Sequence, residues 1–252
     1  MKDAKDIFST QAGTYAAYRP HYPDALYEYL FSVCKGYSKA WDCATGNGQV
    51  AGRLSERYTD VYATDLSAQQ VAHAIQKPNI HYSVQRAEHT NFADNSFDLI
   101  TIGTALHWFD FDAFYKEAIR VAKDGAIIAA WAYAPFRGSE DLDAVVDDFT
   151  YNTLHDYWDP ERKWVDEKYQ TIPFPFEQPE HPDFKINVAW SFKHMIGYLN
   201  SWSSVQHYIR KHGVNPVDAI APKLAQFWKK QETKALEIPL FLKVGLINKQ
   251  SA

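Results

Sequence analysis

The stretch AWDCATGNGQ, residues 40–49, decides the fold, because it joins an apolar run to a turn that contains two glycines. Residues 40–41 end a short strand, and the helix that follows has its apolar stripe within 50–54. Gly46 and Gly48 allow a sharp turn after the strand and let a ligand approach the backbone without meeting a Cβ atom. The stretch therefore predicts a strand, a ligand-binding turn and a helix.

The same alternation of strand and helix continues to residue 133. Further strands are expected at 61–64, 80–84, 97–102 and 126–131, an N-terminal helix at 23–33, and helices at 68–76 (with Ser67 as N-cap) and 111–122 (ended by Gly125). Two later strands are expected at 186–190 and 238–244, and helices at 194–212 and 216–232. Strands separated by helices of this length predict an α/β fold with a doubly wound, mostly parallel, seven-stranded sheet of the Rossmann-like type.

The rhythm breaks after Pro135, where prolines interrupt an aromatic segment that has no clear period. We expect a single domain over residues 1–252. Its parts are an N-terminal helical segment at 1–37, a cofactor-binding core at 38–134, an inserted aromatic and Pro-rich cap at 135–182, and a sheet-completing C-terminal part at 183–252. The cap is expected to lie over the carboxyl ends of the strands.

Composition narrows the class of protein. With 46% hydrophobic residues, 23% charged residues and a net charge of −5, the chain resembles an ordinary globular protein, and a nucleic-acid partner is disfavoured. No window approaches the length of an apolar membrane span, and the N-terminus lacks an apolar stretch of signal-peptide length. Cys34 and Cys43 indicate free thiols in a reducing cytoplasm. The ten histidines show no metal-ligand spacing, so no metal site is expected.

Two cofactors compete for the glycine turn. Gly46-x-Gly48-x-x-Ala51 satisfies the dinucleotide pattern, and Asp65 lies roughly 20 residues on, where an acid binds ribose hydroxyls. A nicotinamide-dependent oxidoreductase is therefore a real alternative. Asp42, four residues before the first glycine, favours the other cofactor. Its carboxylate would repel a pyrophosphate at the helix N-terminus but attract the ammonium and sulfonium of S-adenosylmethionine. The alternative is a strand-end acid that accepts hydrogen bonds from backbone N–H groups.

Several motifs carry a family resemblance. Residues 42–49 resemble the first motif of class I S-adenosylmethionine-dependent methyltransferases of the type 11 domain, with Ala44 where the first motif glycine usually stands. The strings at 18–23, 86–88, 92–98, 105–110 and 198–204 are similar to the trans-aconitate methyltransferase-like subgroup, in the same order. The resemblance covers most of residues 8–247 and spares the middle of the cap.

The resemblance implies a set of cofactor contacts. It implies that the residues around Ala87 line the adenine, that Leu66 packs on its face, and that Gly103 or Thr104 holds the methionine portion through the backbone. Arg86 replaces the family acid that accepts from the adenine amino group, and Glu88 is the candidate to take over. The expected cofactor-binding residues are Tyr18, Arg19, Asp42, Ala44, Gly46, Gly48, Asp65, Leu66, Ala87, Glu88 and Thr104.

Candidate substrate residues follow the fourth and fifth strands, at the edge where open α/β sheets bind ligands. His107 is a candidate general base, or it orients a loop through hydrogen bonds. Trp108, Trp131 and Tyr133 are candidate substrate contacts, with cap packing as the alternative. Arg19 is suited to clamp an acidic substrate, or it forms a structural salt bridge.

Together these features predict a S-adenosylmethionine-dependent methyltransferase of the EC 2.1.1 class that acts on a small molecule by direct displacement at the sulfonium methyl. The subgroup resemblance implies a carboxylic acid substrate methylated on a carboxylate oxygen, which needs no base. The alternatives are a NAD(P)-dependent oxidoreductase and a catalytically inactive S-adenosylmethionine-binding protein. We expect a monomer or homodimer in the cytoplasm, with no membrane or nucleic-acid partner.

Overall fold

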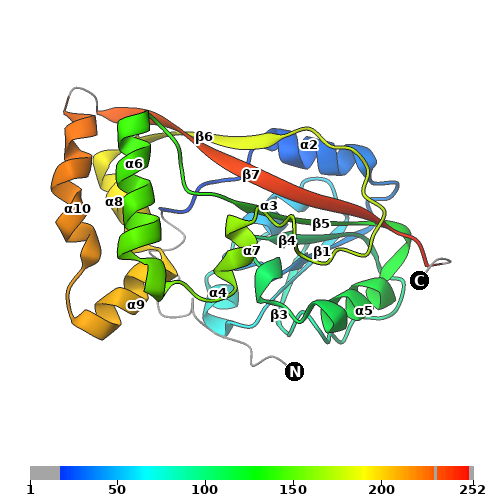
Figure 1. The fold of residues 1–252 in the computed structure, drawn as a ribbon. Helices are drawn as coiled ribbons and strands as arrows, with labels where there is room; N and C mark the ends of the chain where they lie inside the picture. The colour runs from blue at the N-terminus through cyan, green and yellow to red at the C-terminus, as the bar shows by residue number, and fades with distance from the viewer. Residues whose placement is uncertain (1–17, 230–231, 250–252) are drawn as a thin grey trace.

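The computed structural model describes residues 18–229 and 232–249, which form one seven-stranded sheet. The strands lie in the order β3-β2-β1-β4-β5-β7-β6 (Figure 1). Their bounds are β1 Lys39–Cys43, β2 Asp60–Asp65, β3 Ile80–Val84, β4 Phe97–Gly103, β5 Ala122–Tyr133, β6 Phe184–Ser191 and β7 Thr233–Ile247. Neighbours from β3 to β5 pair in parallel, whereas β7 is antiparallel to both β5 and β6. This arrangement confirms the expected fold class.

Helices cover both faces of the sheet. The larger ones are α2 Asp24–Val33, α3 Gln49–Leu54, α4 Ala68–Ala72, α5 Phe111–Val121, α6 Glu140–Asp148, α7 Arg162–Asp166, α8 Phe192–Asn200, α9 Ser203–His212 and α10 Pro216–Ala225. Short turns are η2 Leu106–Trp108, η3 Phe149–Thr153, η4 His155–Tyr157 and η5 Gln226–Trp228. None of the helices described is long and apolar enough to span a membrane.

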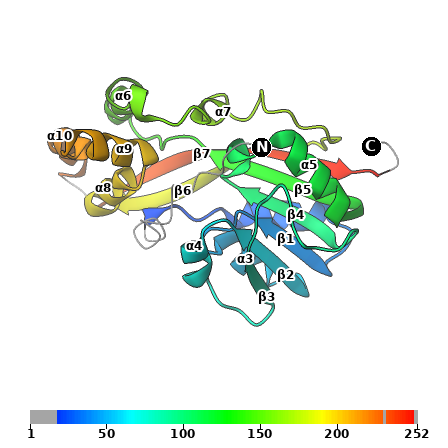
Figure 2. The same cartoon turned by 90° about the horizontal axis from the view of Figure 1, so that it is seen from below.

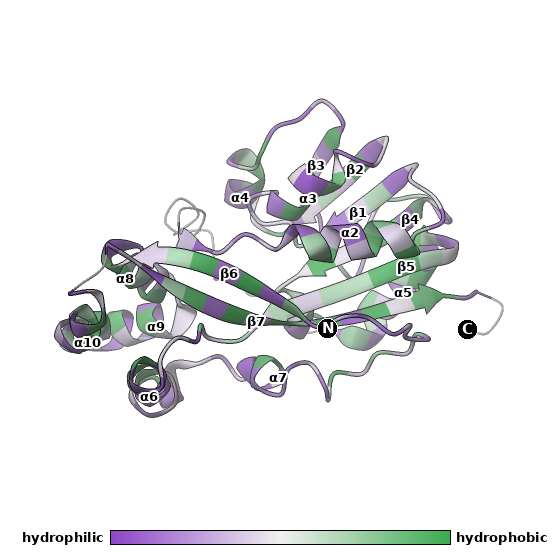
Figure 3. Cartoon of the chain, turned by 90° about the horizontal axis from the view of Figure 1, so that it is seen from above, coloured by the Kyte–Doolittle hydropathy of each residue, from purple (hydrophilic) through white to green (hydrophobic). Residues whose placement is uncertain are grey.

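The core is divided by the sheet into two layers. Leu99 of β4 packs in the layer that contains α2 and α3, while Ile100 and Ile102 pack in the layer that contains α5. This division follows from the two-residue period of a strand, which sends successive side chains to opposite faces. The centre of the sheet is covered on both faces, and Figure 3 shows β5 coloured as hydrophobic along much of its length.

The segment between β5 and β6 holds α6, η3, η4 and α7. Figures 1 and 2 show α6, α8, α9 and α10 grouped at one end of the sheet, and α10 contacts each of the other three. The chain reaches α6 after leaving the carboxyl end of β5 at Tyr133. This helical group therefore lies beyond the same end of the sheet as the loops that follow the parallel strands.

The helix after β2 is shorter than expected. Ser67 does cap it, since its side chain accepts from the Gln70 amide, but α4 ends at Ala72 and not at Gln76. Beyond α4, the Ile75 amide donates to the Asn47 carbonyl at 3.0 Å, and the Ile75 carbonyl accepts from the hydroxyl of Tyr82. These backbone groups stabilise the glycine turn instead of extending the helix.

Three other helix expectations are wrong in their boundaries. The single helix expected at 194–212 is two helices, because Trp202 has an extended backbone with φ −73° and ψ 136°. The helix before β5 ends at Val121, and Gly125, with φ +77°, lies inside β5. The helix expected from residue 216 ends at Ala225 and continues only as the turn η5.

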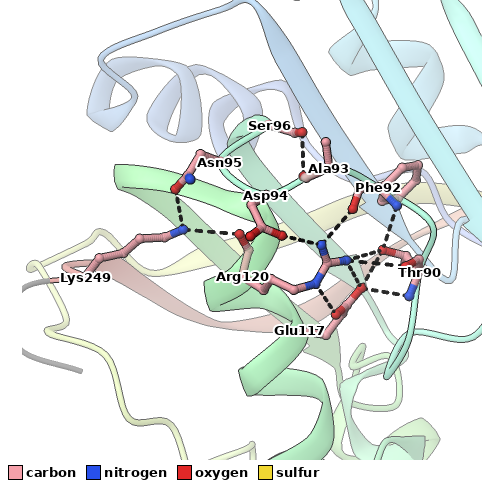
Figure 4. Close-up of polar contacts among 9 residues, drawn as sticks. All are labelled: Thr90, Phe92, Ala93, Asp94, Asn95, Ser96, Glu117, Arg120 and Lys249. Atoms are coloured by element: carbon pink, nitrogen blue, oxygen red, sulfur yellow. Dashed lines mark hydrogen bonds and ion pairs between the residues drawn. The ribbon is translucent and has the colours of Figure 1, made fainter.

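A polar network ties the loop between β3 and β4 to α5 (Figure 4). Glu117 is buried and accepts hydrogen bonds from the Thr90 amide at 2.7 Å and from Nε and Nη2 of the Arg120 guanidinium. Arg120 also donates to the Phe92 carbonyl and to Asp94. Burial alone would raise the pKa of Glu117, but the hydrogen bonds from Arg120 and Thr90 outweigh it and lower the pKa. The network holds the loop that forms one wall of the site described below.

We expect Glu117→Gln to lower the free energy of unfolding by about 2 kcal/mol, because it removes one of the two carboxylates that bind the partly buried guanidinium of Arg120 and leaves only Asp94. Urea unfolding measures this cost. The control is Lys185→Gln, which breaks the exposed ion pair with Glu237 and should cost less than about 1 kcal/mol. Equal effects of the two substitutions would contradict the role given to the network.

Candidate active site

The glycine turn between β1 and α3 has an unusual backbone. Ala44, Gly46 and Gly48 have φ values of +55°, +56° and +79°, in the left-handed region that favours glycine. A Cβ atom on Gly48 would lie 2.2 Å from the hydroxyl of Tyr82, so any other residue would have to displace that hydroxyl in addition to adopting a positive φ. A Cβ atom on Gly46 would meet none of the described atoms within 4 Å. The backbone at Gly46 therefore faces open space, as a ligand cradle requires.

Asp42, at the end of β1, organises this turn. Its carboxylate is 1% exposed, and one oxygen accepts from the Thr45 hydroxyl at 2.5 Å and from the Ala51 amide of α3 at 3.0 Å. The other oxygen accepts from the Thr101 hydroxyl of β4 at 3.0 Å. Burial raises the pKa of Asp42 to about 6, although these hydrogen bonds oppose the rise. A negative charge of the protein itself thus occupies the N-terminus of α3.

Asp65, at the end of β2, is the second acid of the site. One of its oxygens accepts from the Gly46 amide at 2.8 Å and the other from the Ser67 amide at 2.9 Å. The carboxylate therefore links the glycine turn to the start of α4. This position at the strand end matches the expected location of an acid that binds ribose hydroxyls.

A large open cavity, here the first cavity, lies against these two acids. It encloses about 1370 Å³, including the space at its mouth. Its lining includes Asp42, Ala44, Gly46, Asp65, Leu66, Ala87, Glu88 and Thr104, together with Tyr22, Gln85 and Phe109. Leu66 is 41% exposed and offers an apolar face, while Glu88 pairs with Arg86 at 3.5 Å. The wall at 85–88 belongs to the loop that the Glu117 network holds.

Thr104 lies where β4 ends and the first cavity meets a second one. Its φ of +57° is a rare conformation for a β-branched residue. Its hydroxyl shares a hydrogen bond of 2.9 Å with Tyr22, and its amide donates to the Trp131 carbonyl at 2.7 Å. Such strain persists only where surrounding contacts impose it, and it is common at functional sites.

The second cavity encloses about 690 Å³ beneath the segment that follows β5. Its lining comprises Arg19, Thr104, His107, Trp108, Tyr133, Ala134, Pro135, Trp158, Asp159, Arg162, Val165, Tyr198, Trp202 and Ser203. Four residues, Arg19, Thr104, Trp108 and Tyr133, line both cavities. The two cavities therefore meet at a junction made by these four side chains.

Arg19 is a fixed cation at this junction. Its guanidinium donates to the Tyr133 hydroxyl at 2.9 Å and to the Ser201 carbonyl at 3.2 Å, and it lies over the ring of Tyr198. The second cavity holds two further charged side chains, Arg162 and Asp159. Arg162 stacks on Trp158 and pairs with Asp166.

His107 lies in the turn η2 after β4 and is only 6% exposed. Its Nδ1 atom is 2.7 Å from the hydroxyl of Tyr169, which comes from the loop after α7. Trp108 follows it and lines both cavities. The structure thus places both residues predicted from the turn after the fourth strand at the candidate site.

Three of the predicted site residues lie outside the linings of the two cavities. Tyr18 packs edge-on against His194 of α8, so it contacts a helix and not the cavity. Gly48 contributes to the turn through its positive φ, and its α-carbon lies next to the hydroxyl of Tyr82. Trp131 is fully buried, because β5 is covered on both faces, and its ring contacts the lining residue Tyr22. Trp131 is therefore a core residue and not a substrate contact.

The sequence motifs missed part of the second cavity. Trp158 and Arg162 come from the segment without a clear period, where no motif indicated them. Tyr198 and Trp202 do belong to the string at 198–204, which the resemblance had singled out. A buried histidine paired to a tyrosine 62 residues away has no signal in sequence spacing.

Comparison with known proteins agrees with this architecture. Residues 41–130 match the methyltransferase domain family. A relative from Dictyostelium discoideum, named as a methyltransferase, is 31% identical over 228 residues, which cover 89% of this chain and 87% of the relative. A solved structure from Anaeromyxobacter dehalogenans, described as a type II methyltransferase, has a TM-score of 0.85 and 37% identity, and covers 92% of this chain and 99% of the other.

A more distant solved structure shares the fold. Phosphoethanolamine N-methyltransferase 2 of Haemonchus contortus, in complex with phosphomonomethylethanolamine and S-adenosylhomocysteine, has a TM-score of 0.50 and 14% identity. The match covers 99% of this chain and 61% of that protein.

The fold and the site define a Rossmann-like class I methyltransferase. The chain belongs to the methyltransferase domain family. This membership resolves the choice between a methyltransferase and an oxidoreductase that the glycine pattern left open.

Asp42 should make stability depend on pH. Because its pKa rises from 3.8 to about 6 on folding, the folded state binds this proton more tightly, and stability is lost as the pH rises through about 6. Relative to wild type, Asp42→Asn should gain about 2.5 kcal/mol between about pH 4 and about pH 7.5. Urea unfolding of both proteins at the two pH values measures this, and a difference that does not vary with pH would contradict the burial argument.

Proposed function

We propose that this protein is a S-adenosylmethionine-dependent methyltransferase that methylates a small molecule carrying a carboxylate. The observation that most supports S-adenosylmethionine as the cofactor is the hydrogen bond that the Ala51 amide donates to the Asp42 carboxylate. In a dinucleotide site, the helix N-terminus offers its amides to a pyrophosphate. Here an acid of the protein already accepts from the helix, so a second anion would be repelled and a cation attracted.

The remaining residues of the first cavity fit the same cofactor. Asp65 is placed to accept from ribose hydroxyls, and Leu66 and Ala87 offer apolar contacts for an adenine. Glu88, held by Arg86, is the candidate partner of the adenine amino group. The methionine portion would lie along Thr104, toward the junction. The Haemonchus contortus complex with S-adenosylhomocysteine shows that this fold accommodates such a ligand.

The side chains at the junction support a carboxylate as the methyl acceptor. Arg19 lies between the two cavities, where a guanidinium attracts and orients a carboxylate. Trp158, Tyr198 and Trp202 give the second cavity aromatic walls, which suit an apolar or planar body attached to the acid. The strings at 105–110 and 198–204 contribute residues to this cavity, which supports the trans-aconitate methyltransferase-like subgroup as the source of the resemblance.

The chemistry required of the protein is modest. When bound, S-adenosylmethionine supplies an electrophilic methyl group on its sulfonium. A carboxylate acceptor is already an anion, so no side chain has to remove a proton from it. Arg19 and the aromatic walls would orient the acceptor toward the bound methyl donor. Alignment of this kind can supply most of the required rate.

The two free, buried cysteines support a reducing cytoplasmic location.

The cofactor can be tested with S-adenosylhomocysteine as the ligand. At a concentration near 100 times its Kd, it should raise the melting temperature by roughly 5–10 °C, and NAD should not. Asp65→Asn should weaken the affinity at least about 10-fold, because the amide cannot replace both carboxylate oxygens. Asp60→Asn, at the other end of β2, is the matched control and should leave affinity unchanged. A shift with NAD and none with S-adenosylhomocysteine would refute the proposed cofactor.

The acceptor can be tested by measuring S-adenosylhomocysteine release with benzoate, phenylacetate, their primary amides and simple phenols. We expect turnover with an acid and not with its amide. Arg19→Gln should raise the KM for that acid about 10- to 100-fold through the loss of a charge-assisted hydrogen bond, while Arg57→Gln, on the exposed surface, should not. Turnover of the phenols but not the acids would remove the carboxylate and leave the methyltransferase assignment intact.

A further inference from the structure

We propose that Tyr169 is a positioning residue that holds His107 in the tautomer with its proton on Nε2. In this state the histidine offers the second cavity a hydrogen-bond donor and not a base. The inference deepens the proposed function and depends on it only for the identity of the molecule that receives this hydrogen bond. The tautomer itself follows from contacts within the protein.

Tyr169 is held firmly in place. It is 0% exposed, and its ring packs edge-on against Phe241 of β7. Its amide donates to the Trp164 carbonyl at 2.8 Å, and both Lys168 and Tyr169 have left-handed backbones, with φ of +52° and +59°. Neither is a glycine, so contacts with the rest of the structure must impose this conformation. The phenol hydroxyl therefore has a fixed location.

The direction of the hydrogen bond follows from the needs of the buried phenol. Burial raises the pKa of the Tyr169 hydroxyl far above its ordinary value, so it keeps its proton. Within residues 18–229 and 232–249, the acceptor for that proton is Nδ1 of His107, at 2.7 Å. A buried hydroxyl proton without an acceptor would cost stability, so the phenol donates and Nδ1 accepts.

A second contact supports this direction. The backbone N–H of His107 faces the same phenol oxygen and lowers the pKa of Tyr169, although by less than burial raises it. The oxygen thus acts as an acceptor toward the backbone and as a donor toward the ring. A neutral imidazole carries one proton, and because Nδ1 uses its lone pair, that proton is on Nε2.

His107 is part of the lining of the second cavity and Tyr169 is not. We infer that Nε2, the ring nitrogen that does not contact Tyr169, is directed toward the cavity. The charged groups of that lining are Arg19, Arg162 and Asp159. An Nε2–H donor among them can bind an oxygen of an anionic ligand but cannot remove a proton from it.

This assignment changes the expected role of His107. A general base needs a lone pair on the nitrogen that faces the substrate. Because Tyr169 donates to Nδ1, the proton of the imidazole is on Nε2, and Nε2 cannot accept another. A donor instead suits an acceptor that arrives already ionised, and it would bind the carboxylate oxygen beside the one held by Arg19. The ligand class that fits is therefore a carboxylate, and an alcohol or phenol that must first lose its proton is disfavoured.

The test reads the tautomer by 15N NMR of the imidazole side chains in the whole protein, without any ligand. Protonated and bare ring nitrogens have well-separated 15N resonances. Spectra are recorded at about pH 8.5, roughly two units above the ordinary histidine pKa of ~6.5, and the His107 signals are identified by their loss in His107→Gln. We expect the proton on Nε2. A proton on Nδ1, or an even mixture of the two tautomers, would overturn the proposal.

Tyr169→Phe tests the role of the phenol itself. It should convert the single Nε2–H form into a mixture of tautomers. The control is Tyr115→Phe, which removes another buried hydroxyl, one that donates to the Pro173 carbonyl and does not touch His107. No change in Tyr169→Phe, or an equal change in both variants, would refute the positioning role. If Tyr169→Phe does not fold, the wild-type spectrum still decides. Since no cofactor is added, failure here is separate from failure of the titration with S-adenosylhomocysteine.

Discussion

The buried carboxylate of Asp42 is the interaction on which the rest of the site depends. Through three hydrogen bonds it joins the glycine turn at Thr45, the helix α3 at Ala51 and the neighbouring strand β4 at Thr101. Burying an acid is costly, and the raised pKa of Asp42 shows that these bonds do not fully offset the cost. Under the proposed function the compensation is functional, because a charge held at this helix terminus would favour a cationic ligand over a phosphate.

Charge then changes sign along the path from the first cavity to the second. Asp42 and Asp65 line the first cavity, whereas Arg19 lies at the junction. A cationic methyl donor and an anionic acceptor would each be bound by side chains of opposite charge. The two reactants would meet at the residues that both cavities share. This arrangement favours electrostatic positioning over proton transfer, and it agrees with a histidine that is held as a donor by Tyr169.

Local signals in the sequence predicted the parts of the structure that depend on local physics. The strand at residues 80–84 and the cap at Ser67 agree with the structure, since alternation and N-capping act over a few residues. The break at Trp202 and the early end of α4 were missed. Both depend on backbone groups that bond to other elements, such as Ile75 to Asn47, which no periodicity records.

The candidate site likewise has parts that the local sequence predicted and parts that it did not. The glycine turn with its two acids could be predicted because residues close in sequence form it. The second cavity could not, because Trp158 and Arg162 reach it from a segment with no pattern of its own. Trp131 shows the converse error: it shares a face of β5 with Tyr133, but it lies two residues earlier in the strand, where it is fully buried in the core. Asp42 also has the structural role that was the alternative at this position, because its carboxylate accepts from a backbone N–H, that of Ala51 in α3.

The central claim is that two acids and a cationic junction define a methyl-transfer site that joins the two cavities. A crystal structure of the protein with S-adenosylhomocysteine tests it most directly. The account predicts ribose hydroxyls on Asp65, the adenine between Leu66 and Ala87, and the sulfur atom at the junction, facing Arg19 and the second cavity. A ligand whose sulfur atom faces away from the second cavity, or whose ribose is distant from Asp65, would contradict the account.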